Sequence, residues 1–175
     1  MRDLDEARYP TRFASKVWRV PNPTGKLYVN KYLNLTPADR KAHVSGATTL
    51  LTGRRVLQGA IGAEIATRFR TGAGPACQAA TTFTDYPDPD ESRKYPNRNP
   101  AELFPKQFTA LIAYPSGRGI VVWVDEDPLS RIFFPHGGAG IELDRQQEGA
   151  WVLMLDLIVH RVTEELDKFD RGEVA

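Results

Sequence analysis

The stretch that decides the fold is LLTGRRVLQGAIGAEIATRF, residues 50–69. Its apolar residues recur at the spacing of a helix, and the pattern extends back toward Thr36-Pro37, a typical helix start. The predicted helix therefore runs from Thr36 to about Phe69. Its apolar stripe comprises Ala47, Leu50, Leu57, Ile61, Ile65 and Phe69.

Glycines interrupt this predicted helix at positions 46, 53, 59 and 62. Each costs about 1 kcal/mol relative to alanine in a helix interior, so a compensating interaction is needed. Either the helix packs closely on a neighbour through its small residues, or it breaks near Thr52-Gly53 into two helices. A break would place Arg54 and Arg55 at the start of the second helix, a weak match to a helix-turn-helix motif.

Other segments have the composition of strands: Lys16–Val20, Lys26–Leu35, Gln107–Tyr114, Ile120–Val124 and Arg131–Pro135. Turn-forming residues separate the first two strands and the next two, so each pair predicts a β-hairpin. A second long helix is predicted from about Glu148 to Phe169. Its first half is apolar nearly all round, which is typical of a helix buried on every side.

Residues 70–106 show no periodicity and contain six of the 13 prolines. This pattern predicts an extended proline-rich arm that becomes ordered by lying on a neighbour. We therefore expect one α+β domain over residues 1–175, in the order β-β-α-arm-β-β-β-α. An antiparallel sheet of about five strands would be covered by two long helices.

Composition excludes several classes of protein. The chain has 175 residues, of which 41% are hydrophobic and 26% charged, as in ordinary globular domains. Its longest apolar run, Ala150–Leu155, is far shorter than the roughly 20 residues of a membrane span, and the N-terminus does not have the pattern of a secretory signal. The single cysteine, Cys77, excludes an intrachain disulfide. We expect a cytoplasmic protein, or part of an intracellularly assembled particle, with no membrane partner.

Charge is divided unevenly along the chain. Residues 1–72 hold 13 Lys and Arg against 5 Asp and Glu, a net charge of +8, whereas residues 73–175 have a net charge of −7. This asymmetry has three interpretations: the halves neutralise each other within one chain, the basic face of one copy meets the acidic face of the next, or the basic half binds nucleic acid.

Motifs for catalysis are weak. Pro135–Gly140, PHGGAG, is similar to the glycine-rich loops that bind oxyanions in esterases, but no Gly-x-Ser-x-Gly nucleophile motif accompanies it. Asp125-Glu126-Asp127 could ligate a hard cation, and a solvated acidic loop is the simpler interpretation. Asp156 and His160 share a helix face, where a polar pair that satisfies itself is favoured over a general base. The sequence predicts no cofactor and no metal site, and a hydrolase-like enzyme around His136 is the third hypothesis.

The first hypothesis is a non-enzymatic structural protein that self-associates or docks into a larger complex. Connector or terminator subunits of virus-like tails also need surfaces for self-association and docking. This similarity is an analogy of requirements, and no sequence motif supports it. Its candidate interface residues are Tyr28, Tyr32, Tyr86, Tyr95, Val152 and Val159. The alternative is a nucleic-acid-binding protein, whose candidate contacts are Lys16, Arg19, Arg54, Arg55, Arg68 and Arg70.

Overall fold

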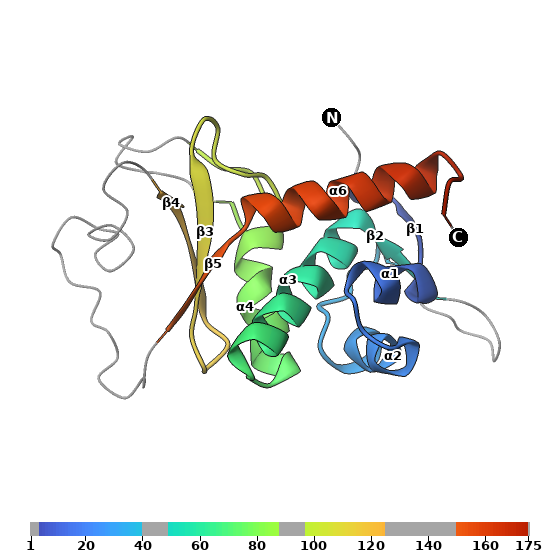
Figure 1. Cartoon of the computed structure of the whole chain (residues 1–175), viewed down its shortest axis with the longest axis horizontal. Helices are drawn as coiled ribbons and strands as arrows, with labels where there is room; N and C mark the ends of the chain where they lie inside the picture. The colour runs from blue at the N-terminus through green and yellow to red at the C-terminus, as the bar shows by residue number, and fades with distance from the viewer. Residues whose placement is uncertain (1–3, 40–48, 88–96, 125–149, 175) are drawn as a thin grey trace, which may run out of the picture.

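The computed structural model describes residues 4–39, 49–87, 97–124 and 150–174. Two small antiparallel sheets lie at opposite ends of a helical body, and α6 runs along that body from one sheet toward the other (Figure 1). The elements are β1 (Ala7–Pro10), α1 (Thr11–Val17), α2 (Asn22–Lys31), β2 (Leu50–Thr52), α3 (Gly53–Phe69), α4 (Ala73–Thr84), β3 (Phe108–Ala113), β4 (Gly119–Val124), β5 (Trp151–Met154) and α6 (Asp156–Asp170).

The α+β class is confirmed, but the strands do not form one sheet of about five. β1 pairs with β2, and a separate sheet has the order β4-β3-β5. The predicted hairpin of β3 and β4 is confirmed, with Phe108 opposite Val124 and Ala113 opposite Gly119. The predicted strand Arg131–Pro135 lies outside the described residues.

A helix does begin at the break predicted near Thr52-Gly53, but the described residues before it, Leu50–Thr52, form strand β2 and not the first of two helices. Thr52 ends β2, and its side-chain oxygen caps α3 by accepting a hydrogen bond from the Arg55 backbone N–H at 3.2 Å. The helix start predicted at Thr36 is wrong, because residues 34–39 form irregular chain with a turn. In that turn the Asp39 carboxylate accepts hydrogen bonds from both the backbone N–H and the hydroxyl of Thr36.

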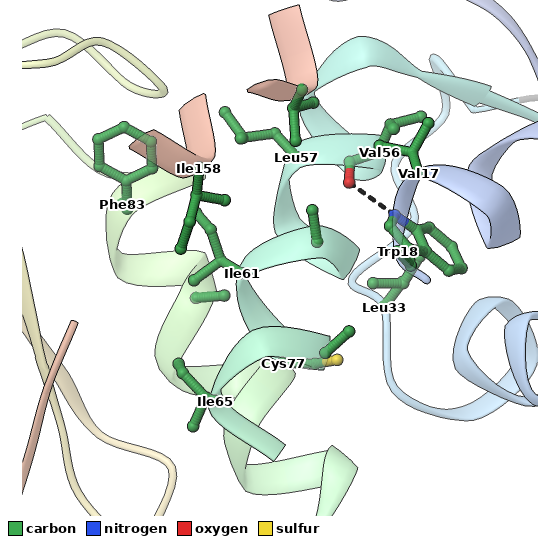
Figure 2. Close-up of a cluster of buried hydrophobic side chains, with 14 of the residues drawn as sticks. Val17, Trp18, Leu33, Val56, Leu57, Ile61, Ile65, Cys77, Phe83 and Ile158 are labelled. Atoms are coloured by element: carbon green, nitrogen blue, oxygen red, sulfur yellow. Dashed lines mark hydrogen bonds between the residues drawn. The ribbon is translucent and has the colours of Figure 1, made fainter. Parts of the chain in front are cut away.

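Close packing through glycine is also observed. A Cβ atom on Gly59 would lie 2.4 Å from Cε2 of Trp18, and one on Gly62 would lie 2.6 Å from Sγ of Cys77. The Trp18 indole N–H donates to the Val56 carbonyl at 2.7 Å, which fixes the ring over the helix surface (Figure 2). The two glycines thus let α4 and the segment after α1 approach the α3 backbone directly, which confirms the explanation by close packing.

The hairpin predicted over residues 16–35 is wrong. Its segments fall in α1 and α2, because Pro23 sits in the first turn of α2, where a missing N–H costs nothing. The buried residues of α2 are Gly25, Tyr28 and Val29, which are at helical spacing that the alternation of residues 27–35 concealed. Tyr28 stacks on Trp18 with ring centroids 5.9 Å apart.

The arm predicted over residues 70–106 contains α4, so its first part is not extended. Pro75 occupies the first turn of this helix, and the buried face consists of small residues with Phe83. These residues, Ala76, Ala79, Ala80 and Phe83, recur at helical spacing and belong to the main core. Figure 2 shows Phe83 and Cys77 of α4 within it. Alanine gives a weak apolar signal, which is why the periodicity was not visible. Residues 88–96 lie outside the described part of the chain.

The predicted helix from Glu148 begins only at Asp156. Residues 151–154 form β5, which pairs with β3 through Leu153 opposite Leu111 and Val152 opposite Ile112. A run of apolar residues without polar interruption is as compatible with a short strand as with a buried helix. From Asp156 onward α6 is amphipathic and buries Ile158, Val162 and Leu166.

The close approach at Gly59 gives a stability prediction. In Gly59→Ala the new methyl group meets the Trp18 indole, so overpacking of about 1–3 kcal/mol exceeds the gain in helix propensity of up to about 1 kcal/mol. We expect the free energy of unfolding, measured by urea denaturation, to fall by about 1–2 kcal/mol.

The matched control is Gly74→Ala in α4, where the nearest atom to a Cβ, Cδ1 of Tyr32, lies at an ordinary 3.5 Å. This variant should be as stable as the original chain or slightly more stable. Equal stability of the two variants would contradict the packing described for α1 and α3.

Candidate contact surfaces

Arg55 lies inside the protein, not on its surface. Its side chain is at the start of α3, only 1% of the residue is exposed, and two acidic side chains face it. Its guanidinium donates to both carboxylate oxygens of Asp85, at 2.6 and 3.1 Å, and to the Gln58 side-chain oxygen at 2.6 Å. Asp39 is 3.7 Å from the Arg55 Nε. A group in this position cannot contact nucleic acid in the folded protein.

The partners of Arg55 are themselves held by further hydrogen bonds. Asp39 accepts from the Thr52 backbone N–H at 2.8 Å, and Gln58 donates to the Cys77 carbonyl at 3.1 Å. Asp85 also accepts from the Asn34 side chain at 3.2 Å. This set of residues, which we call the Arg55 network, joins the 34–39 loop, the start of α3 and the end of α4.

Arg54 is also engaged within the chain. It donates to both oxygens of Asp5, at 2.7 and 2.9 Å, and to the Thr84 carbonyl at 2.7 Å. The hydrogen bond from Arg54 holds the pKa of the Asp5 carboxyl below its usual value. Arg54 and Arg55, predicted as a pair of nucleic-acid contacts, are therefore both structural residues.

Arg98 is a buried cation that the sequence analysis missed. It donates to the backbone carbonyls of Phe83 and Tyr86, at 3.0 and 2.8 Å, and its guanidinium lies 5.0 Å from the centre of the Phe83 ring. Carbonyl groups at a helix C-terminus carry partial negative charge and lack partners within the helix. Three arginines, Arg54, Arg55 and Arg98, therefore bind the C-terminal end of α4 and the residues after it.

Arg19 and Arg68 meet on the surface around Arg161, a residue of α6. The Arg161 guanidinium donates to the Val17 carbonyl at 2.8 Å, and Glu64 of α3 lies between Arg161, at 3.9 Å, and Arg68, at 2.5 Å. Burial and the nearby Arg19 lower the pKa of Arg161, and Arg68 also contributes. We call Arg19, Arg68 and Arg161 the basic cluster. Lys16 is exposed in the last turn of α1, and Arg70 is exposed in a left-handed conformation at the end of α3.

The predicted interface residues have different environments. Tyr28 is buried against Trp18 and serves the core, and Tyr32 is half-buried beside it. Val159 is partly buried against the main core. Tyr86 and Val152 are exposed, whereas Tyr95 lies outside the described residues.

Large exposed apolar side chains gather beside β5. Phe108, Val152 and Met154 are 63%, 37% and 39% exposed, and Leu157, in the first turn of α6, is 79% exposed. The β3–β5 register places Val152, Met154 and Phe108 on the sheet face opposite to Leu111 and Leu153, which belong to the main core. We call Phe108, Val152, Met154 and Leu157 the β5 strip.

The described residues form no group of three or more metal-ligating side chains. Asp156 accepts a hydrogen bond from the Thr109 backbone N–H at 2.8 Å, while His160 is exposed, so the structure does not show the predicted pair. Burial raises the pKa of the Cys77 thiol to about 12, which leaves it protonated and unreactive at neutral pH. His136 and Asp125–Asp127 lie outside the described residues.

Ion pairs within one chain connect the basic and acidic halves. Arg55 with Asp85, and Arg8 with Asp170 at 3.5 Å, each join a cation of residues 1–72 to a carboxylate of residues 73–175. The first interpretation of the charge asymmetry, neutralisation within the chain, therefore applies to these residues.

The Arg55 network predicts a large effect of removing its cation. In Arg55→Met, Asp39 and Asp85 lose their guanidinium partner in a buried site, which costs about 3–5 kcal/mol when one member of a buried ion pair is removed. The free energy of unfolding, measured by urea denaturation at neutral pH, should fall by this amount.

Arg68→Met is the control, because its ion pair with Glu64 is an exposed i, i+4 pair on the surface of α3. Such pairs contribute about 0.3–0.5 kcal/mol, so this variant should be nearly as stable as the original chain. A loss for Arg55→Met as small as that expected for Arg68→Met would show that the Arg55 network does not stabilise the fold.

No described helix has the length and apolar character needed to cross a membrane. Comparison of the chain with protein-family models, with curated proteins and with solved structures gave no match.

Proposed function

We propose that the protein is a non-enzymatic structural subunit that self-associates or docks onto other subunits of an assembly inside the cell. The observation that carries this proposal is the β5 strip. A single exposed apolar residue is ordinary in a soluble protein, but several large ones beside one strand mark an association surface. The proposed partner is a second copy or another subunit of the same assembly.

The backbone of β5 supports the same conclusion. Leu155 donates its N–H to the Thr109 carbonyl at 2.8 Å, so in this antiparallel register every second residue, including Leu153, bonds to β3. The N–H and C=O groups of Val152 and Met154 then point away from β3. In the described part of the chain, no strand pairs with β5 on that side.

Edge strands of monomeric proteins are usually protected by charged residues, proline or a bulge. β5 has the sequence WVLM and contains neither a charge nor a proline. Its pairing with β3 is regular over all four residues. Among the described residues nothing protects this edge, and such an edge next to exposed apolar side chains favours pairing with a strand of another subunit.

A charge placed on the β5 strip should prevent association. Met154→Lys puts an ammonium group in the proposed interface, where its desolvation and its interruption of the apolar surface oppose binding. In sedimentation velocity, the original chain should form oligomers at micromolar concentrations, and Met154→Lys should sediment as a monomer. The circular dichroism spectrum of Met154→Lys should equal that of the original chain, which shows that the variant is folded.

Leu27→Lys is the matched control, because Leu27 in α2 is also 39% exposed but lies outside the β5 strip. It should associate like the original chain. A monomeric original chain, or equal association of both variants, would reject self-association through the β5 strip.

A further inference from the structure

The basic cluster brings together side chains from three segments that are distant in sequence. Arg19 follows α1, Arg68 is near the end of α3, and Arg161 is in α6. The hydrogen bond from Arg161 to the Val17 carbonyl holds its guanidinium two residues from Arg19. The shared carboxylate of Glu64 holds Arg161 beside Arg68.

Positive charge exceeds negative charge at this position. Glu64 is shared by two arginines, and Glu165, whose charge also acts on Arg161, pairs with Lys168 at 2.9 Å. Arg19 has no carboxylate partner among the described residues, and its backbone has a positive φ of 59° after the end of α1. Like charges held together by the fold repel each other unless an anion binds between them.

We propose that the basic cluster binds the phosphate backbone of a nucleic acid without reading its sequence. Guanidinium groups match phosphate oxygens in geometry as well as in charge. Arg19 and Arg68 are exposed, while Arg161 is partly buried and fixed. A cluster of two exposed cations and one partly buried cation suits a partner that presents several phosphates close together. This proposal is independent of the β5 strip, because the two surfaces share no residue.

The test is fluorescence anisotropy with a labelled DNA duplex of about 20 base pairs, titrated with the full chain between about 50 and 200 mM salt. Three phosphate contacts predict a log–log salt slope of about −2.7, which is an affinity loss of about 40-fold over this range. Arg19→Gln/Arg68→Gln retains Arg161 and should leave a slope of about −0.9, with a loss of about 3–4-fold.

Arg118→Gln/Arg171→Gln is the matched control, because it removes the same charge from the β3–β4 turn and from the C-terminal end of α6. The control should keep the slope of the original chain. Urea denaturation of both double variants checks that they are folded. Absence of binding by the original chain at about 50 mM salt would overturn the proposal, as would equal slopes for the two double variants.

Discussion

The arrangement of the helices depends on the hydrogen bonds and ion pairs that the buried guanidinium of Arg55 makes with its partners. It holds Asp85, at the end of α4, and Gln58, inside α3, while Asp39 approaches it from the loop before β2. Each partner also binds backbone or side-chain groups of another segment. A buried charge needs fixed polar partners, and Arg55 has them at both terminal nitrogens, while its Nε has the Asp39 carboxylate at 3.7 Å and no hydrogen bond among the described residues. The network therefore restricts how α3, α4 and the 34–39 loop can pack.

The use of arginine inside the protein changes the meaning of the charge asymmetry. Arg54, Arg55 and Arg98 all bind groups at or near the C-terminal end of α4, which is rich in carbonyl oxygens. Part of the positive charge of the sequence is therefore neutralised by the helix and by carboxylates of the same chain. The surfaces that we propose for partners are of two kinds, the apolar β5 strip and the basic cluster, and they share no residue.

The sequence predicts correctly those features of the fold that depend on local geometry. The turn between β3 and β4, the break before Gly53 and the amphipathic part of α6 all follow from turn residues, glycine and periodicity. Prediction failed where tertiary packing decides: α4 is buried through small alanines, and residues 151–154 form a strand only because β3 lies beside them. The apolar character of a segment alone does not distinguish a buried helix from a buried strand.

The contact surfaces were predictable only in part, for the same reason. Arg54 and Arg55 have the sequence of an exposed helix start, and their partners Asp5 and Asp85 are 49 and 30 residues away. Arg161 appears in the sequence as an ordinary polar residue of α6, although the fold places it between Arg19 and Arg68. Val152 was identified from its apolar character alone, but its exposure at a sheet edge requires the pairing of β5 with β3.

We propose that association between chains uses the apolar edge of β5, whereas charges of the two halves meet within one chain. Size-exclusion chromatography with light scattering, at low and at high salt, measures this directly, because salt screens exposed charge pairs and does not weaken apolar burial. We expect an oligomer whose mass is the same at both salt concentrations. A monomer at both concentrations, or an oligomer that dissociates when salt is added, would contradict it.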